Sequence, residues 1–151
     1  MSIPRSVTRT TKDGVKIISS VDRCQYTIYE LSRAALRDVG KFLVRKVNEK
    51  AQGLKGMKKN PRVRGRNSAF QYWVRKQECD LQVGSKHGTW YGEEQELGSS
   101  KMKKRGFIRA ATEENIAKII EIESVYLSAL EDEAHALSLI DENEMEGGED
   151  E

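Results

Sequence analysis

The stretch TIYELSRAALRDVGKFLVRKVNEKAQG, residues 27–53, decides the fold. Its apolar side chains recur every three or four residues, which is the spacing of one face of an α-helix, and charged side chains fill most of the other positions. The pattern predicts an amphipathic helix of about 25 residues that turns its apolar face toward the core. We expect that face to bury Leu31, Val39 and Phe42.

The two ends of this predicted helix also carry sequence signals. Thr27 and Glu30 have the spacing of a capping box, in which each side chain accepts a hydrogen bond from the other residue's backbone amide. Gly53 is typical of the residue that follows a helix. Gly40 lies inside the helix and costs about 1 kcal/mol relative to alanine, unless close packing requires its missing side chain.

A second helical pattern follows Thr112, which has the residue type of an N-cap and precedes two glutamates. We expect one long helix from Thr112 to about residue 140, with its apolar face turned inward. The face that we expect to be buried contains Ile116, Ile120 and Leu127, and it is widened by Ile119, Ile122 and Tyr126.

Short alternating stretches predict the strands. Residues 70–76 and 79–83 alternate apolar and polar side chains, and the short link between them suggests an antiparallel hairpin without the usual glycine. Residues 15–18 suggest one more short strand. Helix, strands and helix in this order predict the α+β class, with two long amphipathic helices packed on a small antiparallel sheet.

The 151 residues suit one domain, which we place at residues 15–140. Residues 1–14 are rich in serine and threonine and are expected to form a flexible arm. Residues 53–68 combine glycines with basic side chains and almost nothing apolar, which predicts a mobile basic loop. Residues 141–151 are too acidic to fold alone and predict a disordered tail.

The net charge of +2 hides a division along the chain. Residues 1–110 contain 25 Lys and Arg against 10 Asp and Glu, a net charge of +15. Residues 111–151 contain one lysine against 14 Asp and Glu, a net charge of −13. Such a division indicates an electrostatic partner, which can be a nucleic acid, an acidic protein surface or a second copy of the same chain.

Sequence signals for catalysis or metal binding are weak. His87 and His135 have acidic neighbours but no ligand spacing, and Cys24 and Cys79 stand far apart. No phosphate-binding loop, dinucleotide motif or nucleophile elbow is present, so we expect no enzyme, no metal and no cofactor. No apolar run approaches the roughly 20 residues that span a bilayer, and the first residues lack the apolar core of an export signal. We therefore expect no membrane association.

Residues 83–114 carry a string of motifs. Val83-Gly84 is followed by Trp90-Tyr91, then by ELGSSKM at residues 96–102 and GFIRAA at residues 106–111. This string resembles the small morphogenesis proteins of long-tailed bacteriophages, the tail-completion, head–tail joining or tail-terminator family. Its members read VG, then YA, then EFGTSKMPARPFLRPA, with an amphipathic helix on each side. The chain departs from this pattern at Gly106, where the family has proline, in lacking the proline before Ala110, and in its long acidic tail.

The resemblance implies a structural virion protein, assembled in the host cytoplasm, that forms a ring at the neck between the head connector and the tail tube. By family habit the ring is a hexamer. The implied partners are further copies of the chain, the head-connector or stopper protein and the tail-tube protein, with non-specific contact to DNA in the lumen. Glu96, Leu97 and Gly98 are expected to form a turn, and Phe107 and Ile108 to enter the core before the last helix.

Ring or partner contacts are expected at two sets of charged side chains. The basic set lies in two open segments and contains Lys55, Lys58, Lys59, Arg62, Arg64, Arg66, Lys101, Lys103, Lys104 and Arg105. The acidic set lies on the outer side of the last helix and contains Glu121, Glu123 and Glu131. A second hypothesis stays open: a basic nucleic-acid-binding accessory protein with an acidic regulatory tail, although no helix-turn-helix, zinc-finger or RNP-type motif is present.

Overall fold

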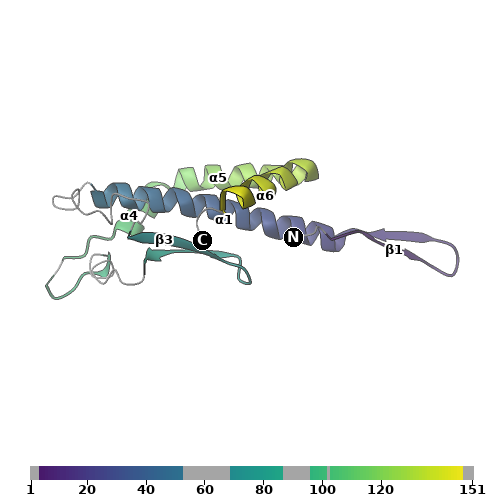
Figure 1. The fold of residues 1–151 in the computed structure, drawn as a ribbon, viewed down its shortest axis with the longest axis horizontal. Coiled ribbons are helices and arrows are strands. Elements are labelled where there is room, and N and C mark those ends of the chain that lie inside the picture. The colour runs from purple at the N-terminus through teal and green to yellow at the C-terminus, as the bar shows by residue number, and fades with distance from the viewer. Residues whose placement is uncertain (1–3, 53–68, 87–95, 102, 148–151) are drawn as a thin grey trace. The chain divides into compact units, whose positions relative to one another are not determined.

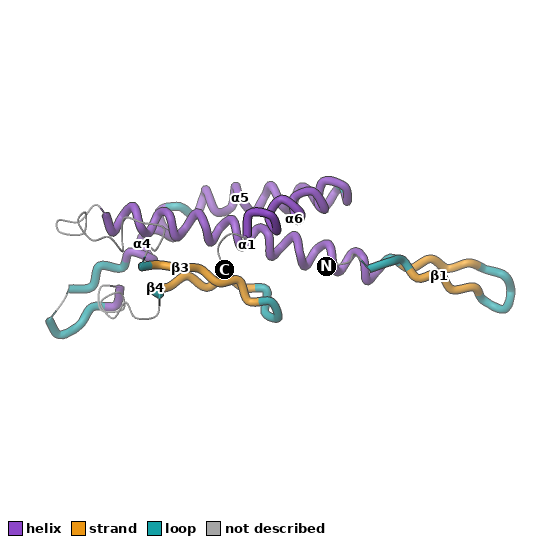
Figure 2. The backbone as a smooth tube through the Cα atoms, in the orientation of Figure 1, coloured by secondary structure: helices purple, strands orange, loops and turns teal. Residues whose placement is uncertain are grey.

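The computed structural model describes residues 4–52, 69–86, 96–101 and 103–147. These residues form four α-helices, a short 3-10 helix and two separate two-stranded antiparallel sheets, in agreement with the expected α+β class. Figure 2 colours the helices and strands along the backbone. In chain order the elements are β1 (Val7–Thr10), β2 (Lys16–Ser19), α1 (Val21–Gln52), β3 (Phe70–Arg75), β4 (Asp80–Ser85), α4 (Phe107–Glu114), α5 (Ile116–Ser128), η2 (Ala129–Glu131) and α6 (Glu133–Gly147).

Where the sequence suggested one domain, the contacts group into two compact units. One unit comprises residues 1–34 and 125–151, and the other comprises residues 35–124. The helices α1 and α5 each continue from one unit into the other.

The helix α1 begins six residues earlier than the sequence predicted, so the capping box is wrong. Thr27 lies inside the helix, and its Oγ1 donates to the backbone carbonyl of Arg23 at 3.0 Å. The Glu30 carboxylate accepts two hydrogen bonds from Arg33 Nη1, at 2.8 and 2.9 Å, and both side chains are buried. The apolar face is confirmed, because Leu31, Val39 and Phe42 are all buried.

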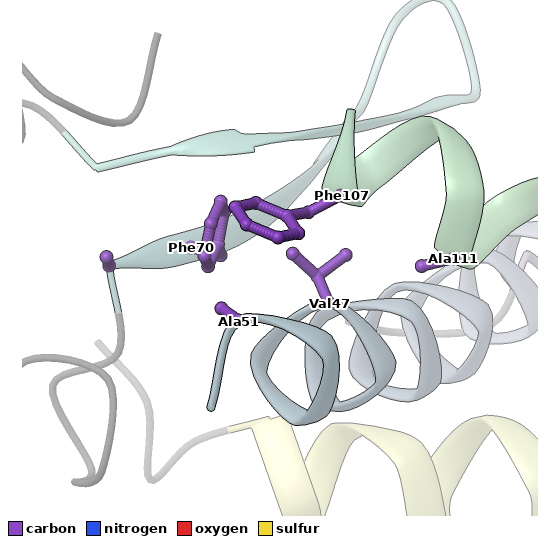
Figure 3. Close-up of a cluster of buried hydrophobic side chains, with 6 residues drawn as sticks. Val47, Ala51, Phe70, Phe107 and Ala111 are labelled. Atoms are coloured by element: carbon purple, nitrogen blue, oxygen red, sulfur yellow. The ribbon is translucent and has the colours of Figure 1, made fainter. Parts of the chain in front are cut away.

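One core cluster of the 35–124 unit fixes where α4 begins (Figure 3). The rings of Phe70 from β3 and Phe107 from α4 lie beside each other over Val47 of α1. Ala51 and Ala111 line the same cluster, and Val47 and Ala111 have no exposed surface. The first turn of α4 is therefore held against the last turns of α1 by burial of two aromatic rings.

A second cluster of this unit joins α1 to the β3–β4 hairpin and to α5. Val39, Phe42 and Leu43 form its buried centre, and side chains of β4 and α5 pack against it: Leu81, Val83, Ile119 and Ile122. In Figure 1, α1 runs between the hairpin and α5. The sequence had suggested that both helices pack on one sheet, whereas α5 packs on α1 and α1 packs on the hairpin.

Gly40 lets α1 approach the hairpin closely. A Cβ atom at this position would lie 2.4 Å from Cδ2 and 2.6 Å from Cγ of Tyr72. Since both atoms lie at the base of the ring, a larger residue would require the strand or the helix to move. Close packing therefore explains a glycine in the middle of a long helix.

The β3–β4 hairpin is confirmed, with Phe70 paired to Ser85 and Arg75 paired to Asp80. Cys79, in the turn, has a φ of 50°, the left-handed conformation that glycine usually supplies. Arg75 Nε donates to Asp80 Oδ1 at 2.7 Å across the base of the turn. This hydrogen bond and the guanidinium charge hold the pKa of Asp80 below its ordinary value.

The second predicted helix is broken into four pieces, α4, α5, η2 and α6, and it starts earlier than expected. Thr112 is not its N-cap, because Thr112 lies within α4 and its Oγ1 donates to the carbonyl of Ile108 at 2.9 Å. Asn115 ends α4, and its side-chain amide donates to the carbonyl of Ala111 at 2.8 Å. The asparagine competes for backbone groups and separates α4 from α5.

The apolar face expected for this helix is also wrong. Ile116, Ile120 and Leu127 are 52%, 58% and 65% exposed. Ile119 and Ile122 pack against the second core cluster instead, and Tyr126 is buried. The helix carries two adjacent apolar stripes, and periodicity alone does not say which of them meets the core.

In the unit formed by residues 1–34 and 125–151, α6 follows η2 and is joined to α1 by an ion pair between Arg23 and Glu133. Ala136 and Ile140 of α6 are buried. The helix runs on to Gly147, so residues 141–147, which we expected in a disordered tail, are helical.

Candidate functional site

The motif residues that carry the resemblance come together at the start of α4. Glu96 Oε2 accepts a hydrogen bond from the backbone amide of Ile108 at 3.0 Å, and Oε1 accepts one from the amide of Arg109 at 3.2 Å. A helix leaves its first amides without partners and places a partial positive charge there. A carboxylate from twelve residues upstream therefore caps α4 and closes the intervening segment into a loop.

Gly98 brings the two arms of this loop into contact. It has a φ of +83°, and a Cβ atom there would lie 2.9 Å from the backbone nitrogen of Lys104. Only glycine satisfies both the left-handed conformation and the close approach. We call the segment between these two positions, residues 98–104, the pinched loop.

Gly106 turns the chain from the pinched loop into α4. It has a φ of 59° and a ψ of 48° and contributes no side-chain cap. The cap is instead the carboxylate of Glu96. Because proline holds φ near −65°, the proline of the family pattern would not fit this conformation. The entry into α4 therefore differs here from the entry that the resemblance implies.

The pinched loop and the residue after it expose a concentrated positive charge. Lys101, Lys103, Lys104 and Arg105 are all exposed, and the backbone amide of Lys101 donates to Ser99 Oγ at 3.4 Å. Immediately after them, Phe107 is buried and Ile108 packs against the first core cluster, as predicted. Leu97, in contrast, is 64% exposed. The site thus presents four cations on a loop whose base is anchored in the core.

The charged side chains of α4 pair with one another or with α1. Arg109 Nε donates to Glu113 Oε1 at 2.8 Å, and this hydrogen bond and ion pair raise the pKa of the guanidinium. Lys50 of α1 pairs with Glu114 of α4. Each of these pairs is neutral, so neither offsets the charge of the loop.

The three predicted acidic contact residues lie on two elements. Glu121 on α5 is exposed and accepts a hydrogen bond from Lys118 at 2.7 Å, whereas Glu123 on the same helix is half-buried. Glu131 is exposed in η2. The other predicted basic residues, Lys55, Lys58, Lys59, Arg62, Arg64 and Arg66, lie outside the described residues, as do His87, Trp90 and Tyr91.

Two features of the surface were missed from the sequence in whole or in part. The first is the β1–β2 hairpin: the strand expected at residues 15–18 is found as β2, but its pairing with β1, inside the segment expected to be a flexible arm, was missed. The turn sequence Thr11-Lys12-Asp13-Gly14 was its available signal. The second is the exposed apolar stripe of α5. The sequence shows that stripe clearly but does not show that the described residues leave it exposed.

Within the described ranges, no three His, Cys, Asp or Glu side chains form a group that could hold a metal ion. Nor does any described helix combine the length and apolar character needed to cross a bilayer. No protein family, curated protein or solved structure matches this chain. The exposed lysines and arginine of the site can hold carboxylates or phosphates by charge and hydrogen bonding.

Proposed function

We propose that this chain is a structural virion protein that forms a ring at the head–tail junction of a long-tailed phage. There it joins or terminates the tail tube at the head connector. The observation that supports this proposal is the closed loop at the start of α4, where Glu96 caps the helix and Gly98 pinches the loop. The same residues carry the resemblance to the phage morphogenesis family. The motif residues thus form one physical device, a capped helix start that closes a cationic loop.

This device suits a ring because the cations of the loop are exposed, while Phe107 and Ile108 immediately after them pack in the core and fix its position. In a closed ring each subunit meets its neighbour through two different faces. The pinched loop offers a positive face, and the segment from residue 111 onward, with a net charge of −13, offers a negative one. Exposed ion pairs contribute only about 0–1 kcal/mol each, so charge selects the register while apolar contacts hold the ring together.

The proposed partners are further copies of the chain, in a ring that is by family habit hexameric, with the head-connector or stopper protein on one side and the tail-tube protein on the other. Contacts between lumen-facing cations and DNA are non-specific in this proposal. Mass spectrometry of purified particles tests it, together with the genes beside the one that encodes this chain. Presence in the particle and neighbouring portal, capsid and tail-tube genes support the proposal. Absence from the particle contradicts it.

A second candidate is a nucleic-acid-binding accessory protein with an acidic regulatory tail. The exposed cations at Lys101, Lys103, Lys104 and Arg105 favour it, because lysine and arginine gain affinity by releasing phosphate counterions. Filter binding at increasing salt discriminates between the two. Affinity that falls steeply with salt, in a protein absent from particles, supports the accessory role. Weak binding by a protein that is present in particles supports the neck ring.

A further inference from the structure

The N-terminal hairpin, residues 7–19, is a defined structure rather than a loose arm. Its two strands pair in register from Val7 with Ser19 to Thr10 with Lys16. Thr11 organises the turn, because its amide donates to the carbonyl of Val15 at 2.9 Å and its carbonyl accepts from Gly14 at 3.0 Å. Gly14 has a φ of +79°, which completes a tight turn that few other residues allow.

None of the residues that the structure describes buries the side chains of this hairpin. All residues from 5 to 20 are exposed, including apolar side chains on both faces: Ile17 is 53% and Ile18 is 68% exposed. A two-stranded hairpin that packs against nothing is marginally stable in water, and exposed β-branched side chains add no stability there. A turn this specific, with apolar side chains left in solvent, indicates a surface that becomes buried against a partner.

The charge of the hairpin restricts what that partner can be. Residues 4–20 contain four basic side chains and one acidic side chain, a net charge of +3. Arg9 lies opposite Ile17 in the register, and Lys16 lies opposite Thr10, so cations flank the apolar side chains on both faces. For the face that carries Ile17 and Arg9, a matching partner surface is therefore apolar with an acidic side chain beside the apolar residues.

The exposed stripe of α5 has that chemistry. Ile116, Ile120 and Leu127 follow one another along one side of the helix and are all more than half exposed. At 100° per residue Glu123 lies beside this stripe, about 40° from its centre, whereas Glu121 lies about 120° from the centre and pairs with Lys118. The described residues leave this stripe exposed, although its spacing is that of a core-facing helix.

We propose that the N-terminal hairpin of one copy docks on the exposed α5 stripe of a second copy. The hairpin face that carries Val7, Arg9 and Ile17 would meet the stripe, with Val7 and Ile17 over Ile116 and Ile120 and Arg9 beside Glu123. The contact joins two different faces, so it can repeat from copy to copy, and it forms a ring when the rotation between neighbouring copies closes. This inference deepens the proposed neck ring and rests on self-association of the chain.

Disulfide trapping tests the proposed contact directly. Ile17→Cys and Ile120→Cys are introduced together into a chain in which Cys24→Ser and Cys79→Ser remove the native thiols. Both new positions are exposed, so the substitutions leave the folded units intact. Oxidation should give a ladder of covalent multimers that mass spectrometry assigns to a bond between chains. A bond within one chain, or no bond, overturns the proposal.

Native mass spectrometry at low and high salt then separates the hairpin from the ring as a whole. The pair Val7→Ser with Ile17→Ser should weaken association by about tenfold or more, because it removes the apolar side chains of the docking face. The matched control is Val21→Ser, an equally exposed apolar residue just beyond the hairpin, and it should leave association unchanged. A ring that both variants form equally well overturns the hairpin contact while the ring stands. A wild-type chain that stays monomeric contradicts both.

Charge exchange supplies the last arm of the experiment. Arg9→Glu should weaken association, and so should Glu123→Lys. The two changes combined in one chain should restore it, since the glutamate of the hairpin then meets the lysine of the neighbouring α5. Failure of the combination to recover any association contradicts the pairing of these two surfaces.

Discussion

Replacement of Glu96 by alanine tests whether this carboxylate closes the loop at α4. The change removes the acceptor for two backbone amides, those of Ile108 and Arg109. Arg109 is exposed, so water replaces its lost bond, whereas Ile108 is half-buried and its amide is left poorly solvated. Loss of a helix cap costs about 1 kcal/mol, and a hydrogen bond to a charged group is worth about 1.5–3 kcal/mol. We therefore expect the free energy of unfolding to fall by about 1–2 kcal/mol.

The assay is amide exchange at Ile108 together with denaturant unfolding. A loss of about 1.4 kcal/mol in local stability corresponds to about tenfold faster exchange. Glu96→Gln keeps one acceptor oxygen and should show a smaller effect. The matched control is Glu113→Ala on the same helix, which loses only the exposed pair with Arg109 and should leave exchange at Ile108 unchanged. Equal effects of Glu96→Ala and Glu113→Ala would refute the cap.

Three other outcomes follow from the same structure. Gly40→Ala should destabilise the chain by about 1–2 kcal/mol, because a clash with the Tyr72 ring outweighs the gain of about 1 kcal/mol in helix propensity. The control is Gly84→Ala, whose added Cβ atom would meet no other atom within 4 Å. A Gly40→Ala variant that is more stable than wild type in denaturant unfolding would contradict this packing. Asp80→Asn should lower the melting temperature at neutral pH, because it removes the ion pair with Arg75. The difference from wild type should shrink as the pH falls below about 4 and vanish once the wild-type carboxyl is protonated, since the folded-state pKa lies below the unfolded one. A difference that stays constant from pH 7 to pH 2 would contradict the ion pair. Deletion of residues 141–151 should leave the ring intact in native mass spectrometry, and loss of the oligomer would instead give the acidic tail a structural role.

The first helix could be predicted well because its apolar residues recur at helical spacing and lie on a single face. Leu31, Val39 and Phe42 lie on the only long apolar stripe of that segment, and all three are buried. Its start could not be predicted, because Thr27 and Glu30 satisfy the spacing of a cap while lying in mid-helix. There the threonine donates to the preceding turn, and the glutamate pairs with Arg33. Spacing alone does not separate these two situations.

The second helical region shows a different limit. Its sequence contains two apolar stripes, and the one marked by Ile119 and Ile122 faces the core while the one marked by Ile116 and Ile120 faces solvent. Which stripe is buried depends on how α5 is rotated about its axis where it packs on α1, after the interruption of the helix at Asn115. That rotation is set by tertiary packing and not by the local sequence. The stripe marked by Ile116 and Ile120 is left exposed by the described residues, which makes it a candidate for a contact with another molecule.

The start of α4 could be predicted in part from the motif, but the contacts that its residues make could not. The motif identified Glu96, Gly98 and Phe107, and burial of Phe107 is confirmed. The role of Glu96 could not be predicted, because a cap usually comes from a residue next to the helix and this one comes from twelve positions away. The N-terminal hairpin was predicted only in part: residues 15–18 suggested the strand found at Lys16–Ser19, whereas the mostly polar residues 5–10 gave no strand signal, so the pairing was missed.

Cryo-electron microscopy of particles of the phage that encodes this chain tests the neck-ring proposal most directly. The proposal predicts a closed ring of this chain between the head connector and the tail tube, with α4 and its pinched loop recognisable in each subunit and the N-terminal hairpin lying on α5 of the neighbour. A neck whose density is fully accounted for by other proteins, with this chain absent, contradicts it.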